Sequence, residues 1–279
     1  DWYGVYEGES NKSAALIRAI NAGVDMVMIP YDYESFSRDM HRAVENGDIS
    51  QARIDDAVKR ILTAKFNAGL FDTEPTNGVT LDVVGSKEHK ELARVAVQQS
   101  LVLLKNTDVL PLSKKVDSIL VAGSSADTIG RQSGGWTVEW QGIDGNWIPG
   151  TTILAGIKNI VSPTTDIQYD IHGVFPKQTA KADVGIAIVG EAPYAEGWGD
   201  NAHPSLSTED ITTIARLKAQ SNKLVVIIIS GRPLDIAPYS DTWDAVVAAW
   251  LPGSEGMGIA DVLFGDVPFT GRLPIEWTL

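Results

Sequence analysis

The first 70 residues combine helical apolar patterns with one short continuous apolar run. Apolar side chains recur at helical spacing over residues 10–22, and Gly23 ends that segment. The run over residues 24–30, closed by a proline, is typical of a buried parallel strand. Two further helices are predicted, one over residues 33–46 and one over residues 50–68 with its first serine as the cap. The last helix places its apolar residues on one face: Ile54, Val58, Ile61, Leu62 and Phe66.

The remaining residues have the pattern of a second, larger domain. Residues 71–86 carry proline and glycine with little periodicity, which predicts an inter-domain linker. An amphipathic helix is expected over residues 88–104. Strand and helix patterns then alternate, which predicts a mostly parallel sheet covered on both faces. The expected strands are 119–122, 184–189, 224–229 and 245–250, and the expected helices are 152–160, 208–221 and 255–264.

Composition and charge narrow the possible ligands. The chain has 279 residues, of which 44% are hydrophobic and 21% charged, as in ordinary globular domains. A net charge of −13 disfavours nucleic acids and anionic membranes, whereas a neutral sugar meets no repulsion. No apolar run reaches the roughly 18 residues that a membrane span needs. The opening residues are typical of neither a signal peptide nor a translation start.

The usual motifs of cofactor and metal enzymes are missing from the sequence. It has no cysteine, no dinucleotide-binding glycine motif, no phosphate-binding loop, no zinc-protease motif and no serine-hydrolase elbow. The four histidines are scattered without the spacing of metal ligands. We therefore expect neither a cofactor nor a metal.

Tryptophans gather in segments that have the composition of loops. The glycine-rich stretch 133–142 contains Trp136 and Trp140 and is too polar for a core strand. An indole in such a place either anchors its loop or stacks on the apolar face of a sugar ring, and the pattern leaves both open. The loop-like tryptophans are Trp2, Trp136, Trp140, Trp147 and Trp198.

Two glutamates follow one buried strand at its carboxyl end, where open α/β sheets bind ligands. Glu191 emerges directly from the strand, and Glu196 lies in the middle of the following loop between small residues. Either could serve as an acid or base, and the residue pattern alone does not choose between them.

Several motifs, in order along nearly the whole chain, resemble glycoside hydrolase family 3, in particular its two-domain β-glucan exohydrolases. The opening Asp1-Trp2-Tyr3-Gly4 resembles the segment that carries the family's nucleophile at the end of the seventh barrel strand. Residues 22–28 resemble the eighth strand, and residues 54–62 the last barrel helix. Further matches are Leu101–Asn106 with Leu110-Pro111-Leu112, Gly134–Gly142, Gly190–Glu196, Ile229–Pro233, Trp250–Gly256 and Phe264–Pro274.

The resemblance implies a role for several residues. Asp1 is the expected nucleophile and Glu196 the expected general acid/base, while Glu191 is expected to be structural. Trp2 and Trp140 are the expected pair that clamps a sugar. Family members often carry an arginine about six residues after the nucleophile. Here that position is Glu7, which bears on the linkage preference.

The implied fold is the end of a (β/α)₈ barrel followed by a parallel-rich α/β sandwich domain. We expect the barrel remnant over residues 1–70, the linker over 71–86 and the sandwich over 87–279. The implied activity is that of a retaining, exo-acting β-glucosidase or β-glucan glucohydrolase, secreted or periplasmic, acting on β-glucans or β-gluco-oligosaccharides. We expect activity from the full enzyme rather than from this portion alone. The alternatives are a β-xylosidase-like member and a non-catalytic sugar-binding α/β module.

Overall fold

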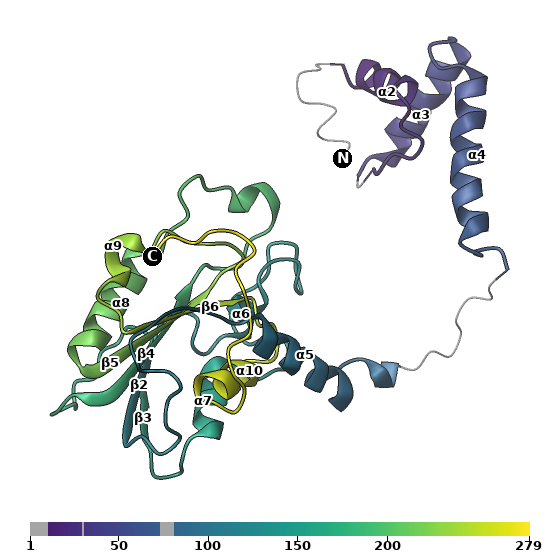
Figure 1. Cartoon of the computed structure of the whole chain (residues 1–279). Coiled ribbons are helices and arrows are strands. Elements are labelled where there is room, and N and C mark those ends of the chain that lie inside the picture. Colours follow the sequence, from purple (N-terminus) through teal and green to yellow (C-terminus); the bar gives the residue numbers. More distant parts are fainter. Residues whose placement is uncertain (1–10, 30, 73–80) are drawn as a thin grey trace. The chain divides into compact units, whose positions relative to one another are not determined.

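A computed structural model describes residues 11–29, 31–72 and 81–279 (Figure 1). The chain divides into two compact units, residues 1–80 and residues 81–279, and this division falls inside the predicted linker. Each unit is described by itself below.

In its described residues, the first unit has helices as its only regular elements. It consists of α2 (Lys12–Asn21), α3 (Tyr33–Glu45) and α4 (Gln51–Asn67). The predicted cap of α4 is present, because the Ser50 hydroxyl accepts the Arg53 N–H at 3.2 Å. Glycines with positive φ follow all three helices, as is common at helix ends.

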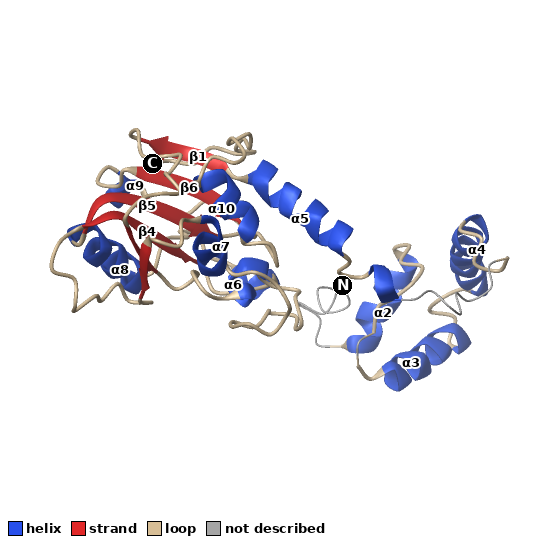
Figure 2. Ribbon diagram, turned by 90° about the horizontal axis from the view of Figure 1, so that it is seen from below, coloured by secondary structure: helices blue, strands red, loops and turns tan. Residues whose placement is uncertain are grey.

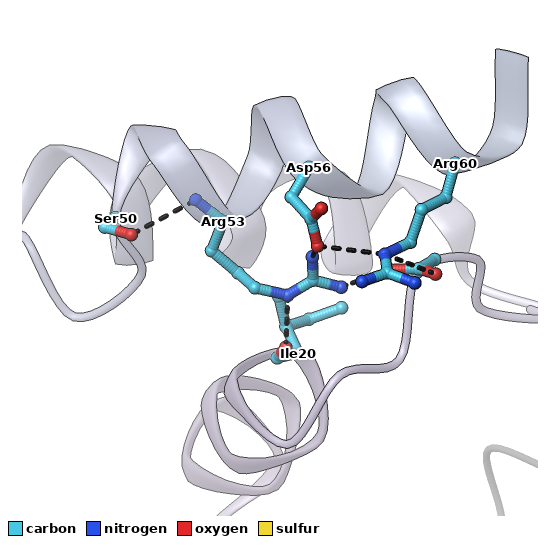
Figure 3. Close-up of polar contacts among 6 residues, drawn as sticks. Ile20, Ser50, Arg53, Asp56 and Arg60 are labelled. Carbon is cyan, nitrogen blue, oxygen red and sulfur yellow. Dashed lines mark hydrogen bonds and ion pairs between the residues drawn. The ribbon is translucent and has the colours of Figure 1, made fainter. Parts of the chain in front are cut away.

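A small core lies between the helices, and one arginine of α4 links this helix to α2 and to the segment that follows α2. The buried side chains are few, which makes polar contacts between the helices more important. Arg53 donates to the Ile20 carbonyl at 2.9 Å, forms an ion pair with Asp25 and pairs with Asp56 at 2.8 Å (Figure 3). Arg60 extends the network by donating to Asp56 at 3.0 Å (Figure 3). The core is formed by Leu16, Ile20, Ala43 and Ile49.

The predicted buried strand over residues 24–30 is wrong for the described residues 24–29. These residues form no strand, and the side chains of Met26 and Met28 are 72% and 73% exposed. A parallel strand needs a hydrogen-bonding neighbour, and the described part of this unit supplies no second strand. The predicted face of α4 is also largely uncovered, with Phe66 60% exposed. The apolar side chains of residues 24–29 and of α4 therefore stay largely exposed in this unit by itself.

The second unit is built on a six-stranded sheet with the order β1-β6-β5-β4-β2-β3. Figure 2 shows β1, β6, β5 and β4 side by side. Four neighbouring pairs are parallel, and the edge strand β1 runs antiparallel to its neighbour β6. This confirms the predicted parallel-rich α/β architecture. The strands are β1 (Val102–Asn106), β2 (Ser118–Ala122), β3 (Asp166–Tyr169), β4 (Ala182–Gly190), β5 (Ser221–Ile229) and β6 (Ala245–Trp250).

Helices cover both faces of this sheet (Figures 1 and 2). Alternate side chains of β5 point to opposite faces, so that Val225 and Ile227 join one core and Val226 and Ile228 the other. The first core packs against α5, α7 and α10, and the second against α8. The helices are α5 (Lys87–Ser100), α6 (Ile129–Ser133), α7 (Ile153–Ile160), α8 (Thr208–Ala219), α9 (Ala237–Ser240) and α10 (Met257–Leu263). Two short 3₁₀ turns, η1 (Leu81–Val83) and η2 (Glu196–Gly199), complete the unit.

One predicted helix is too long. The helix expected over residues 88–104 ends at Ser100 as α5, and residues 102–106 form β1 instead. A short apolar run fits a helix end and a buried strand equally well, and pairing with β6 decides between them here. The short elements β3, α6 and α9 were not predicted, because their patterns span too few residues to stand out.

The sheet brings β4 and β5 unusually close at the carboxyl end of β4. Gly190 has φ +155°, and a Cβ atom there would lie 1.8 Å from the Ile229 carbonyl oxygen. Only glycine fits this position. Because Gly190 pairs with Ile229, the last residue of β5, the loop after β4 starts beside the end of β5. The strand order also reverses between β2 and β4, which is the position where open α/β sheets bind ligands.

We expect Gly190→Ala to destabilise the second unit by about 3 kcal/mol or more, because the added methyl group meets backbone that cannot move aside. The matched control is Gly253→Ala. Gly253 also has a positive φ, +61°, but has open space around its Cβ position, so that the cost should be about 1 kcal/mol. Urea unfolding followed by tryptophan fluorescence measures both, since all tryptophans but Trp2 lie in residues 136–277. Equal losses for the two variants would contradict the assigned contact.

Candidate functional site

Two loops lie together beyond the carboxyl edge of the sheet. The first follows α6 and spans residues 134–142, and the second follows β4 and spans residues 191–200. The Ala195 N–H donates to the Gln141 side-chain oxygen at 2.9 Å, which joins the two loops directly. A Cβ atom at Gly135 would lie 2.1 Å from the Tyr194 carbonyl oxygen, so the backbones are in close contact. The structure thus brings together the tryptophan-rich loop and the loop with the two glutamates.

Glu196 is presented to solvent at the start of η2. Its side chain is exposed, whereas the preceding Ala195 is only 4% exposed and is held by Gln141. The backbone of Glu196 has φ +53°, a conformation that non-glycine residues adopt rarely and at a cost of roughly 1 kcal/mol. Such a conformation persists only where the surroundings impose it, and it occurs often at functional sites.

Glu191 is engaged in a dense polar network instead. One carboxylate oxygen accepts from Arg232 at 2.6 and 3.1 Å. The other accepts from the Ser230 hydroxyl at 2.6 Å and the Tyr194 hydroxyl at 3.2 Å. The hydrogen bonds from Arg232 to Glu191 raise the pKa of the guanidinium, and burial together with the Glu191 charge raises the pKa of Tyr194. These donors hold the Glu191 carboxylate in place against Arg232, Ser230 and Tyr194, and its structural role stays a prediction.

Trp140 lies in a tight turn of the first loop. The Trp136 N–H donates to the Trp140 carbonyl at 2.9 Å, and the two rings are 6.3 Å apart at an angle of 50°. Both indoles are exposed, Trp136 by 70% and Trp140 by 46%. Val138 between them has φ +65°, which is rare for a β-branched residue. The turn therefore presents flat aromatic faces to solvent, as stacking on a sugar ring would require.

The other loop-like tryptophans in the described residues are exposed too, Trp147 by 69% and Trp198 by 78%. Trp147 donates its indole N–H to the Asp144 carbonyl at 2.6 Å, so it anchors its own loop. Trp198 lies in η2, two residues after Glu196. Anchoring is therefore shown for Trp147, whereas stacking on a sugar stays a prediction for Trp140.

A polar cleft of about 760 Å³ opens at the strand-order reversal. Ser124 after β2, Glu191 after β4 and Arg232 after β5 all contribute to its wall, and Trp198 lies at the same cleft. Asp210 of α8 is also part of the wall, although only 3% of it is exposed. Burial raises the pKa of Asp210, and the hydrogen bond from the Ser124 hydroxyl at 2.8 Å opposes that shift.

Three of the predicted residues, Asp1, Trp2 and Glu7, lie outside the described residues. Within the described ranges no group of three or more histidines, aspartates and glutamates is arranged to hold a metal ion. None of the helices in those ranges is long and apolar enough to cross a membrane.

Two residues of the site were not singled out by sequence reasoning. Gln141 holds the Ala195 N–H, and Arg232 holds both Glu191 and the Gly199 carbonyl. The available signals for Arg232 were its place in the Ile229–Pro233 match and its position three residues after a predicted strand. A single arginine in a loop is too common to be recognised by position alone.

Comparison with known proteins gives two family matches. The Glycosyl hydrolase family 3 C-terminal domain matches residues 101–279, and the Glycosyl hydrolase family 3 N terminal domain matches residues 3–64. The lysosomal beta glucosidase of Dictyostelium discoideum is 35% identical over 94% of this chain, which covers 35% of that protein. The periplasmic beta-glucosidase of Salmonella typhimurium is 32% identical over 93% of this chain, which covers 38% of that protein.

A solved structure is similar in fold as well as in sequence. The exo-1,3/1,4-beta-glucanase of a Pseudoalteromonas species superimposes with a TM-score of 0.84 at 39% identity. The match covers 94% of this chain and 34% of that one. The chain thus spans a little over one third of the length of the curated relatives it matches.

The buried Asp210 carboxyl should make stability depend on pH. A raised folded-state pKa means that the protonated form is favoured by folding, so this contribution is present in acid and lost as the pH rises through the raised pKa. Asp210→Asn keeps an acceptor for Ser124 and removes the charge. The free energy of unfolding of this variant relative to the wild type should therefore rise from about pH 4 to about pH 7.

Urea unfolding at a series of pH values measures this difference. The control, Asp241→Asn, removes an exposed carboxylate and tests whether loss of any negative charge has the same effect. A pH-independent difference for Asp210→Asn, or an equal trend in the control, would refute the assignment.

Proposed function

The chain belongs to glycosyl hydrolase family 3, and on this basis we propose that it carries the general acid/base of a retaining, exo-acting β-glucosidase or β-glucan glucohydrolase. The proposed substrates are β-glucans or β-gluco-oligosaccharides, cleaved to release glucose from non-reducing ends. The observation that carries the proposal is the exposed Glu196, which is held on an anchored turn joined to the Trp140 loop. Glu191, the competing glutamate, is occupied by four hydrogen bonds.

The proposed mechanism uses two carboxyl groups about 5 Å apart. The Asp1 carboxylate attacks the anomeric carbon while Glu196 donates its proton to the departing glycosidic oxygen. This step breaks the C–O bond and leaves a covalent glycosyl-enzyme. Glu196, now a carboxylate, then takes a proton from a water molecule that attacks the same carbon, which releases the sugar and restores Asp1.

Trp140 is proposed to stack on the sugar unit that leaves, together with Trp2. The exposed indole of Trp140 lies in the loop whose Gln141 side chain supports the Glu196 turn. An aromatic face in that position would orient the leaving sugar relative to the proton donor.

Two alternatives remain in competition with this function. A β-xylosidase-like member would have the same carboxyl groups but another sugar pocket, so a panel of aryl glucosides and xylosides on the whole protein separates the two. A non-catalytic sugar-binding module would retain binding and show no turnover with any substrate. The periplasmic relative supports a secreted or periplasmic location, which fractionation of the source cells tests.

Glu196→Ala in the whole protein should lower turnover of β-linked glucose disaccharides by about 10²–10⁴-fold, because the leaving oxygen loses its proton donor. The kcat/KM for 2,4-dinitrophenyl β-glucoside should fall far less, since that leaving group departs without a proton. Its kcat should still fall, because the glycosyl-enzyme has lost the base that activates water. Added azide should then replace the water that Glu196 activates and give the β-glucosyl azide. Asp1→Ala should abolish formation of the glycosyl-enzyme with both substrates.

Glu191→Ala is the matched control for this experiment. If Glu191→Ala showed azide rescue and Glu196→Ala did not, the wrong glutamate has been assigned. The α-glucosyl azide as product would show inversion and would overturn both carboxyl assignments.

Trp140→Ala should raise the KM for disaccharides by about 10-fold, the effect of losing roughly 1–1.5 kcal/mol of aromatic stacking. Aryl glucosides should retain most of their kcat, because the carboxyl groups are untouched. Trp147→Ala is the control, since Trp147 is also exposed but bonded within its own loop. Equal effects of the two substitutions on KM would remove Trp140 from the proposed subsite.

A further inference from the structure

Arg232 contacts the loop of residues 191–200 at its first residue, at Tyr194 and at Gly199 near its end. It donates to the Glu191 carboxylate at 2.6 and 3.1 Å and to the Gly199 carbonyl at 2.7 Å. Its guanidinium also lies 4.7 Å from the centre of the Tyr194 ring, within the range of a cation–π contact. One side chain from the loop after β5 therefore ties both ends of the neighbouring loop together.

The geometry of the loop depends on this arrangement. A Cβ atom at Gly199 would lie 2.1 Å from Tyr194 Cδ2, so the end of the loop is packed directly against the ring that Arg232 covers. Glu196 lies between Tyr194 and Gly199, with its backbone in a left-handed conformation. This conformation carries a cost for glutamate, so the contacts that hold the loop help to maintain it: those of Arg232 and the hydrogen bond from the Ala195 N–H to Gln141.

Charge and burial indicate that the contact is strong. The side chain of Glu191 is 16% exposed and that of Arg232 27% exposed, so water screens the pair only partly. Loss of Arg232 would leave a partly buried carboxylate with two donors fewer and release the Gly199 carbonyl. The expected consequence is displacement of the loop as a whole rather than loss of one local contact.

We infer that Arg232 is a positioning residue for Glu196, acting through Glu191 and Gly199, and this inference rests on the proposed function of Glu196. Without Arg232 the Glu196 carboxyl leaves the geometry in which it can protonate the departing oxygen. Misplacement of a catalytic group by about 1 Å can lower a rate about 10²-fold. The attack of the nucleophile does not depend on this loop in the same way.

The test compares leaving groups in the whole protein. Arg232→Gln should lower kcat/KM for a β-linked glucose disaccharide by about 10–100-fold and kcat/KM for 2,4-dinitrophenyl β-glucoside by less than about 3-fold. Azide should partly restore turnover of the activated substrate, as for Glu196→Ala. Arg232→Lys should restore only part of the disaccharide activity, because a single ammonium group cannot reproduce the forked contact to Glu191 and Gly199.

The matched control is Arg94→Gln. Arg94 forms a comparable forked contact with the buried Asp261 at 2.5 and 2.6 Å, between α5 and α10. Its loss should destabilise the fold without making the rate depend on the leaving group. If Arg232→Gln proves unstable, Gly199→Ala displaces the same end of the loop without removing a charge and should give the same selectivity.

The outcomes separate the inference from the function on which it rests. Suppose that Glu196→Ala shows the leaving-group dependence. If Arg232→Gln then lowers kcat/KM for both substrates equally, or for neither, Arg232 is not a positioning residue and the inference is overturned. If kcat/KM of Glu196→Ala itself shows no dependence on the leaving group, the proposed role of Glu196 is wrong, and the inference about Arg232 has lost its basis. Hydrogen exchange at the Ala195 amide gives a readout besides activity, and it should accelerate in Arg232→Gln but not in Arg94→Gln.

Discussion

Parallel pairing of the central strands determines where the candidate site can form. Parallel strands end at the same edge of a sheet, so the loops after β2, β4 and β5 meet there. The close approach of Gly190 to Ile229 then fixes the loop after β4 directly beside the loop after β5. The contact between Glu191 and Arg232, which are 41 residues apart in sequence, follows from this one constraint.

Much of this fold was predictable because its strands are long, apolar and bounded by turns. The patterns over residues 184–189 and 224–229 correspond to β4 and β5, and alternate residues of each serve the two cores. The errors came where one apolar pattern is compatible with more than one structure. Residues 101–104 continue a helical pattern, yet residues 102–106 pair as a strand with β6. Residues 24–29 have the composition of a buried strand, yet the described residues of their unit offer no strand to pair with.

The candidate site, too, could be predicted from the sequence only in part. Resemblance to a family indicated Glu196 and Trp140, and the structure brings their loops together through Gln141. The different environments of Glu191 and Glu196 follow from hydrogen bonding, since one is surrounded by donors and the other is exposed. The segment of Arg232 is part of a family match, but the contacts of this residue could not have been found from the segment, because they exist only once two loops are adjacent in space. Asp1, Trp2 and Glu7 lie outside the described residues, so their roles stay predictions.

The left-handed backbone at position 196 means that selection for stability and selection for activity favour different residues there. Glycine, and to a lesser degree asparagine, adopts φ +53° more easily than glutamate does. A library of variants screened only for folded protein would therefore drift toward glycine at this position. If Glu196 is the general acid/base, as proposed, screening the same library for sugar release would retain glutamate at this position. Under the proposed function, Glu196 gives up conformational ease for chemistry, so its replacement by glycine should yield a more stable but disabled protein.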